Sequence, residues 1–236
     1  MKRFYRDVSI GEVIVGEAGG YQVLLDGRAI RTQGGAPQIA PTRALVEIMA
    51  EEWRSQGPEI DIRSFPHRDL VDYAIDQVAP AREASIAKLL GYAETDTLCY
   101  RADPDEPLFQ RQQELWEPMV TASEATYGIR FERISGIVHR SQPEATLSGL
   151  RARLEALDDF ALAGLLTLAS LAASLIAALA VLDQHGEPDA MFAAANLEED
   201  WQAQQWGWDV EAEKVRAVRE EAFRLAARFI SLSRTD

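Results

Sequence analysis

The feature that most constrains the fold of this chain is an uncharged apolar run of 23 residues at positions 160–182. Its length would allow a membrane-spanning helix. Nine of its residues are Ala or Gly, however, and it is flanked by Asp158, Asp159 and Asp183, whereas membrane spans are typically flanked by Lys or Arg. We therefore expect buried helical structure at the centre of a helical domain, either one long helix or two shorter ones with a break near residues 172–174.

The first third of the chain is typical of a small sheet with two helices. Segment 21–32 predicts two antiparallel strands joined at Asp26-Gly27, a pair that tolerates positive φ angles. A helix capped by Thr42 follows, and a second helix is expected at about residues 68–78. Loops are expected at the glycines of this region, which are Gly11, Gly16, Gly19, Gly20, Gly34 and Gly35.

Pro80 marks the expected boundary between two domains. The predicted fold class is α+β, with a small mixed α/β amino-terminal domain of antiparallel strands and helices at residues 1–80. The carboxy-terminal domain, residues 81–236, is predicted to be all-helical in class, although segments 97–102 and 130–138 look extended. Within it, Ser141 to Glu144 has the spacing of a capping box that starts a helix.

The last helix has the most regular pattern in the sequence. Its apolar residues recur at intervals of three and four and predict one buried stripe, formed by Val215, Val218, Ala222, Leu225, Phe229 and Leu232. The basic residues off this stripe are expected on a solvated side, and they are Arg216, Arg219, Arg224 and Arg228. Asp209 can cap the start of this helix.

The charge balance limits the classes of partner. The chain has 24 Lys and Arg against 38 Asp and Glu, and its net charge of −14 disfavours nucleic acid and anionic membrane as partners. The same charge disfavours self-association, so we expect a monomer. The single cysteine, Cys99, is expected to be a buried structural thiol. The amino terminus has neither an apolar run of signal length nor a presequence pattern, and we expect a cytoplasmic protein.

The sequence contains no familiar catalytic constellation. Glycines 16–20 lack the spacing of a dinucleotide or phosphate-binding loop, and the three histidines form no ligand-spaced pair, so neither a cofactor nor a metal is expected. One alternative is an enzyme with an unrecognised carboxylate site around Asp69, Asp72 and Asp76. Another is a general holdase or scaffold. The pattern as a whole favours a binding protein without catalytic residues.

Segment 196–209, NLEEDWQAQQWGWD, places three of the five tryptophans beside an acidic triplet. A helical wheel that starts at Pro188 assigns the core face to Ala190, Ala193, Ala194, Leu197 and Trp201. The opposite face holds Phe192, Ala195, Glu199, Gln202 and Trp206. The last three form a ridge of carboxylate, amide and indole, which either meets a partner or packs under another part of the chain. Gly207 is expected to end this helix.

The residues Leu197–Gly207, LEEDWQAQQWG, resemble the L-E-E-x-[aromatic]-Q-x-x-x-W-G signature of the assembly chaperone for the α subunit of the F-type ATP synthase. Five more segments resemble the same family, in the family's order: RFYRDV, YQVLLDGRAIRT, EEWRSQ, TDTLCYR and LWEPM. The resemblance spans roughly Arg3 to Asp209. A departure is Gln33, where the family often has proline, and this leaves the turn after the strand open.

This resemblance implies a non-enzymatic molecular chaperone that binds the free α subunit and prevents its aggregation until it assembles with β. It implies a bacterial, cytoplasmic member of a family also found in mitochondria, with a small α/β domain followed by a helical domain. An acidic residue of functional importance carries over to Glu198 or Glu199, of which the wheel favours Glu199. The expected partner-binding residues are therefore Glu198, Glu199, Gln202, Trp206 and Gly207.

Overall fold

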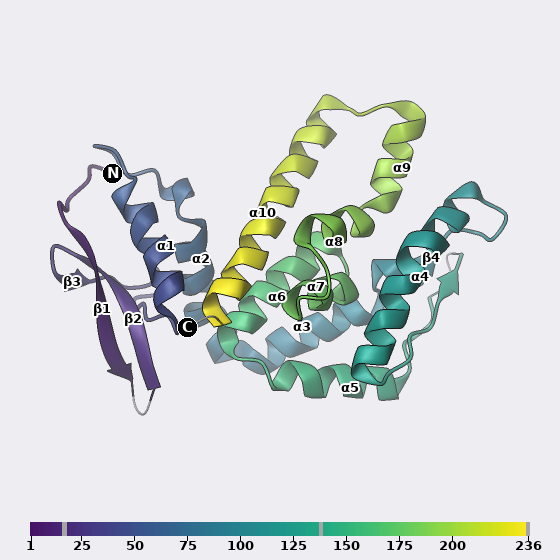
Figure 1. Ribbon diagram of the computed structural model, residues 1–236, viewed down its shortest axis with the longest axis horizontal. Helices are drawn as coiled ribbons and strands as arrows, with labels where there is room; N and C mark the ends of the chain where they lie inside the picture. The colour runs from purple at the N-terminus through teal and green to yellow at the C-terminus, as the bar shows by residue number, and fades with distance from the viewer. Residues whose placement is uncertain (16–17, 137–138, 235–236) are drawn as a thin grey trace. The chain divides into compact units, whose positions relative to one another are not determined.

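The computed structural model describes residues 1–15, 18–136 and 139–234, whose course is drawn in Figure 1. The chain forms two compact units. Unit 1 contains residues 1–82, 158–164 and 228–236, and unit 2 contains residues 83–157 and 165–227. Helices α6 (Asp159–Ala172) and α10 (Val210–Arg234) contribute residues to both units. A domain boundary near residue 80 stays a prediction, which limited proteolysis would test.

Unit 1 is built on a three-stranded antiparallel sheet in the order β1-β2-β3. The strands are β1 (Val8–Val15), β2 (Ala18–Leu25) and β3 (Arg28–Ala29). The predicted turn at Asp26-Gly27 is confirmed, with φ angles of 48° and 77°. The Asp26 carboxylate stabilises it by accepting hydrogen bonds from the backbone N–H groups of Arg6 and Asp7, at 3.0 and 2.8 Å.

Several glycines of unit 1 lie in strands, and the expectation of loops at Gly11, Gly19 and Gly20 is wrong. Gly20 has a packing reason for its position, because a Cβ atom there would lie 2.6 Å from Cγ2 of Ile39. Glycine within a strand often marks such a close approach. The loop at Gly34 and Gly35 is confirmed. Gly16 lies outside the described residues.

Of the two helices in unit 1, α1 packs on the sheet and α2 packs against α1. Helix α1 (Arg43–Arg54) starts at its predicted cap, because Oγ1 of Thr42 accepts a hydrogen bond from the backbone N–H of Leu45 at 3.2 Å. A 3-10 turn (Ile62–Ser64) precedes α2 (Pro66–Tyr73), which continues through a π-helical turn (Ala74–Val78) and a 3-10 turn (Ala79–Ala81). The predicted second helix is thus present, with a change of winding in its second half.

Unit 2 is mainly helical, and the predicted α+β class is confirmed. Besides parts of α6 and α10, its helices are α3 (Arg82–Glu94), α4 (Pro107–Tyr127), α5 (Glu144–Glu155), α7 (Leu175–Leu182), α8 (Pro188–Ala195) and α9 (Leu197–Trp206). The two segments expected to be extended supply a 3-10 turn (Thr97–Cys99) and a short parallel pair of strands, β4 (Tyr100–Arg101) and β5 (Ile134–Ser135). Residues 137–138 lie outside the described residues.

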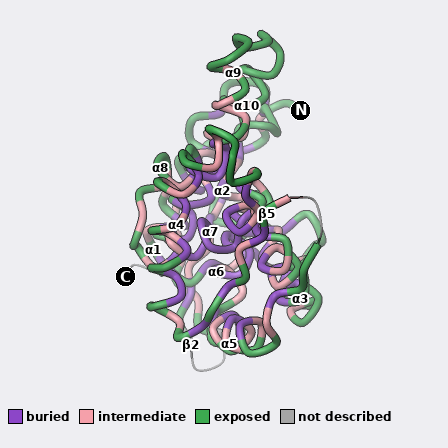
Figure 2. Tube along the Cα trace, turned by 90° about the vertical axis from the view of Figure 1, so that its right-hand side faces the viewer, coloured by how far each residue is buried: buried purple, intermediate pink, exposed green. Residues whose placement is uncertain are grey.

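The apolar run forms two helices with a break where one was expected. Helix α6 ends at Ala172, Ala173 has a φ angle of 48°, and Ser174 caps α7 by accepting a hydrogen bond from Ala177 N–H at 3.0 Å. The buried carboxylate of Asp96 accepts another from the N–H of Ile176 at 2.9 Å. Figure 2 shows buried residues following α6 and α7. Within the described residues, no helix is both long and apolar enough to span a membrane.

The predicted capping box at Ser141–Glu144 is wrong. Helix α5 begins at Glu144, with Pro143 at its cap position and no side-chain capping bond. Tertiary partners hold the preceding residue instead, because Gln142 donates its backbone N–H to Glu94 (3.1 Å) and accepts the N–H of Glu132 (2.9 Å). Three-residue spacing alone therefore does not establish a cap.

Candidate functional site

The segment that the sequence singled out lies on two helices, not one. Helix α8 ends at Ala195, its cap residue Asn196 has φ and ψ angles of −101° and 19°, and α9 starts at Leu197. The helical wheel assumed a continuous helix, and its faces are wrong before this break. Phe192 is buried, whereas Ala193 is exposed. After the break, Leu197 is buried as expected, whereas Trp201 is of intermediate exposure and does not belong to the core.

The first two acidic residues of α9 contact different helices. Glu198 accepts a hydrogen bond from Nε2 of Gln112 on α4 at 2.8 Å, and loss of solvent around its carboxylate raises the pKa of Glu198. Glu199 forms an ion pair with Arg219 of α10, with an N–O distance of 2.5 Å. Its side chain keeps 35% of its surface exposed. Glu199 thus lies between two helices rather than on a free ridge.

A second ion pair joins α9 to α10. Two hydrogen bonds run from the guanidinium of Arg216 to the carboxylate of Asp200, at 2.8 and 2.6 Å, and these bonds raise the pKa of Arg216. The same guanidinium lies 5.2 Å from the ring centre of Phe192 and 5.8 Å from that of Trp208. Only 13% of the Arg216 side chain is exposed. The prediction that Arg216 and Arg219 occupy a solvated side is therefore wrong.

Of the apolar stripe predicted for α10, only Phe229 is buried, and Ala222, Leu225 and Leu232 are of intermediate exposure. Val215 and Val218 are 51% and 70% exposed. The residues that α10 buries come later, and they are Phe223, Ala226, Ala227, Phe229 and Ile230. In the first half of the helix, Arg216 and Arg219 face α9 and form ion pairs with it. Val215 and Val218 lie off this face and are exposed to solvent. Figure 1 shows α9 and this half of α10 side by side, joined by a short connection.

The connection between α9 and α10 is a sharp corner with aromatic residues on both sides. Gly207 ends α9 with a φ angle of 84°, as predicted, and Asp209 caps α10 by accepting the N–H groups of residues 211 and 212 at 3.0 and 3.1 Å. Trp206 is 80% exposed, and Gln202 is also exposed. We call the exposed large apolar residues of this hairpin the hairpin patch: Trp206, Trp208, Val210, Val215 and Val218.

The residues that sequence reasoning missed are the two paired arginines and the outward valines. A signal for the arginines exists in the sequence, because Asp200 and Arg216 lie at equal distances on either side of Trp208. Two helices that turn back at this corner would bring them together. The valines carry no such signal, since their spacing is equally typical of a buried stripe.

The carboxylates proposed as an alternative enzyme site hold a loop instead. Asp76 accepts hydrogen bonds from Oγ1 of Thr32 (2.7 Å) and the N–H of Gly34 (2.8 Å), and Asp72 accepts one from the N–H of Gln33 (3.0 Å). Burial raises the pKa of Asp72. Gln33 therefore supplies a backbone donor that the proline common in the family would lack. Within the described residues, no group of three or more metal-ligating side chains occurs.

Comparisons with known proteins agree with the motifs read from the sequence. The family profile described as ATP12 chaperone protein matches residues 2–124. The mitochondrial protein atp12 of Schizosaccharomyces pombe is 25% identical over 222 residues, which cover 87% of this chain and 74% of that protein. The crystal structure of Atp12 from Paracoccus denitrificans has a TM-score of 0.92 and 37% identity, covering 99% of this chain and 98% of that one. The Atu1473 protein of Agrobacterium tumefaciens has a TM-score of 0.91 and 36% identity, with coverage of 98% and 85%.

Proposed function

The chain belongs to the ATP12 chaperone protein family, and from this premise we propose that it binds the free α subunit of the F-type ATP synthase and prevents its aggregation until it assembles with β. Membership of the family makes it a chaperone of ATP synthase assembly. The choice of the α subunit is supported by the LEEDWQAQQWG segment. We propose further that it acts as a monomer in the bacterial cytoplasm, without catalysis, cofactor, nucleic acid or membrane.

The observation that carries this proposal is the hairpin patch. Among the residues that the structure describes, nine large apolar residues are exposed, and five of them lie within Trp206–Val218. Concentrated exposed apolar surface marks an interaction site, and tryptophan is the residue type most often found at binding hot spots. A subunit awaiting assembly exposes apolar surface that its neighbour will later bury, so this patch has the chemistry to cover it.

The proposed partner-binding residues have different roles in this arrangement. Trp206 and Gln202 are exposed and are proposed to contact the client directly. Gly207 shapes the corner through its positive φ angle, which side chains rarely adopt. Glu199 is proposed to act by holding α10 in place through Arg219. Glu198, bonded to Gln112, is proposed to link the hairpin to α4.

Replacing Trp206 tests the proposal. We expect Trp206→Ala to weaken binding to isolated α subunit by about ten-fold or more, because a mostly exposed indole contributes to binding and little to folding. Affinity is measured by titration, and chaperone activity by light scattering of aggregating α subunit. The control variant is Ile62→Ala. It also removes an exposed apolar side chain, but in unit 1 and away from the hairpin patch, and it is expected to bind α subunit as wild type does.

Two results would contradict the proposal. If wild type fails to bind α subunit, the client is wrong. If Trp206→Ala and Ile62→Ala bind equally well, the hairpin patch is not the binding surface. An unrelated aggregating protein, tested beside α subunit, separates a dedicated chaperone from a general holdase.

A further inference from the structure

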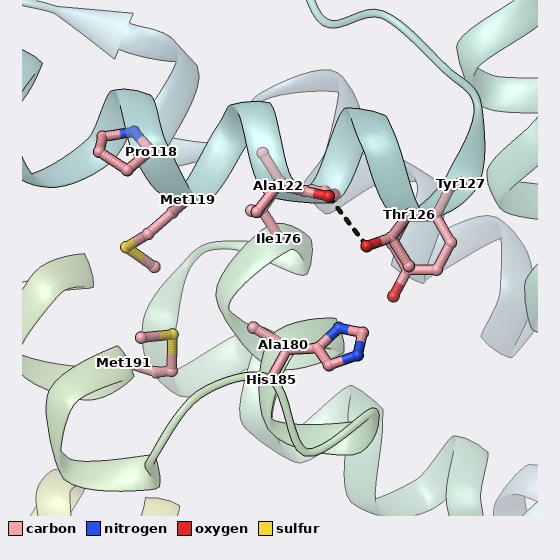
Figure 3. Close-up of a pocket in the computed structure, with 10 residues that line it drawn as sticks. Pro118, Met119, Ala122, Thr126, Tyr127, Ile176, Ala180, His185 and Met191 are labelled. Carbon is pink, nitrogen blue, oxygen red and sulfur yellow. Dashed lines mark hydrogen bonds between the residues drawn. The ribbon is translucent and has the colours of Figure 1, made fainter.

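Unit 2 contains an apolar pocket that is separate from the hairpin patch. It lies between α4, α7 and α8 and has a volume of about 240 Å³. Figure 3 shows Met119 of α4 facing Met191 of α8 at one end of the pocket, with Ile176 and Ala180 of α7 beside them and His185 and Tyr127 towards the other end. A cavity of about 150 Å³ holds a benzene molecule, so this pocket has room for one aromatic or long aliphatic side chain.

One face of α4 connects the pocket to α9. Gln112, Trp116, Met119 and Ser123 are three or four residues apart and therefore share a face of the helix. At one end of this face, Gln112 bonds Glu198 of α9 (2.8 Å), and Trp116 donates its indole N–H to a backbone carbonyl of α8 (2.7 Å). Gln112 and Trp116 are themselves fully buried, so a packed face of α4, and not an open groove, links the pocket to the acidic start of the proposed binding hairpin.

Hydrogen bonds hold the walls apart at the far end of the pocket. The Tyr127 hydroxyl donates to Asp183 at 2.5 Å, and Arg153 donates to the other oxygen of the same carboxylate at 2.6 Å. Together with the bonds of Gln112 and Trp116, these contacts fix α4 on both sides of the pocket. The backbone of α4 beside Met119 is therefore anchored on both sides of the pocket, and moving the helix as a whole towards α8 would require breaking these hydrogen bonds.

The pocket lining indicates what kind of group it takes. Methionine side chains are flexible and polarizable and adapt to apolar groups of different shape. Ser123 is nine-tenths buried in the wall, and its hydroxyl has no hydrogen-bond partner among the residues that the structure describes. An apolar side chain of a polypeptide brings a backbone N–H or C=O group with it, and such a group could bond the Ser123 hydroxyl. A pure hydrocarbon has no polar atom and would leave this hydroxyl without a partner.

We propose that this pocket takes one apolar side chain of the client, of the size of leucine, methionine or phenylalanine, while the client is bound at the hairpin patch. The inference rests on the proposed function and adds a second, separate point of contact to it. A client held at both places would be bound by an aromatic anchor at the hairpin and by its own side chain in the pocket. The pocket then selects clients that present an apolar side chain at the right distance.

The four methionines of the chain provide a direct test, because Met119 and Met191 line the pocket, whereas Met49 is buried in unit 1 and Met1 is exposed. The full chain with ¹³C-labelled methionine methyl groups is titrated with isolated α subunit and followed by NMR. We expect the signals of Met119 and Met191 to shift or broaden well beyond that of Met49. Equal changes at all four methionines, or none, with α subunit bound in the same sample, would overturn the pocket and leave the proposed function standing.

A pair of variants on α4 provides the second test. Ala122 is exposed at the mouth of the pocket, and Ala125 is exposed on the same helix but does not line it. Ala122→Trp is expected to cover the mouth and weaken binding of α subunit by about ten-fold, whereas Ala125→Trp should bind as wild type does. Circular dichroism checks that both variants fold. Equal affinities for the two folded variants would overturn the inference, and absence of α-subunit binding by wild type would overturn the proposed function together with it.

Discussion

Helices α6 and α7 and the α9–α10 hairpin are both rich in apolar residues, but they use them in opposite ways. The α6–α7 run has no charged residue between 160 and 182 and is covered on nearly all sides. In the hairpin, carboxylates and arginines lie between the two helices, and tryptophan and valine side chains face outwards. Because ion pairs join α9 to α10, the apolar side chains of the hairpin are not needed between the two helices and remain exposed for contact with a partner. The hairpin therefore has the surface of a binding element, and α6–α7 that of a scaffold.

The largest expected difference concerns the free energy of unfolding. Leu179 of α7 is 1% exposed, and Leu179→Ala is expected to lower the free energy of unfolding by about 2–5 kcal/mol because it leaves a cavity. Val218→Ala, in the hairpin patch, is the matched control and should change it by less than about 0.5 kcal/mol. Urea unfolding followed by circular dichroism measures both. Similar losses for the two variants would remove the contrast between core and hairpin.

A smaller effect is expected from the ion pair between Asp200 and Arg216. Its two hydrogen bonds and low exposure predict a coupling energy of about 1–2 kcal/mol in a double-mutant cycle with Arg216→Ala and Asp200→Ala. The pair of Arg224 with Asp189 is more exposed and serves as the control, with coupling of at most about 0.5 kcal/mol. If the coupling energy of Arg224 with Asp189 equals that of Arg216 with Asp200, burial between α9 and α10 does not strengthen the ion pair of the hairpin.

The smallest effect is a pH dependence confined to the scaffold. Complete burial raises the pKa of Asp96, next to the start of α7, to about 6, against about 3.9 in an unfolded chain. The folded state therefore binds this proton more tightly, and the stabilisation that protonation provides is lost as the pH rises through about 6. Lowering the pH from 7 to 5 should raise the free energy of unfolding by about 1 kcal/mol through this group.

Asp96→Asn separates this contribution from all other titrating groups. The variant is expected to be less stable overall, because Asp96 accepts backbone N–H groups at both carboxylate oxygens and asparagine has only one acceptor oxygen, but its stability should lack the gain between pH 7 and pH 5. Urea unfolding at the two pH values measures the difference between wild type and variant. The same gain in both proteins would show that Asp96 does not titrate in this range.

Features set by neighbouring residues were predicted well. The turn at Asp26-Gly27, the cap at Thr42, the end of α9 at Gly207 and the cap at Asp209 all depend on contacts within a few residues. The break in the apolar run was also placed within a residue or two. The family resemblance, carried by six segments in the family's order, also predicted the fold class. Members of one family share a tertiary structure, so the resemblance carries information that local patterns lack.

Features that depend on distant partners were predicted poorly. Helix α8 ends at Ala195 in a chain segment whose composition suits a continuous helix, and the wheel drawn across the break therefore assigns the wrong faces to residues of α8. The valines of α10 were assigned to the core because periodicity measures spacing and not which side of a helix is covered. Ser141 failed as a cap because Gln142 is held by residues 94 and 132.

The sequence by itself determined that this chain has a buried helical centre, a small antiparallel sheet near its start and a helix end at Gly207, because length, charge and turn chemistry are local properties. Only the tertiary structure decided that Arg216 and Arg219 face α9, that Val215 and Val218 face solvent, and that α4 leaves a pocket beside Met191. The physical reason is that either the apolar or the charged face of an amphipathic helix can pack against a neighbouring helix. Ion pairs formed with a particular neighbour choose between them.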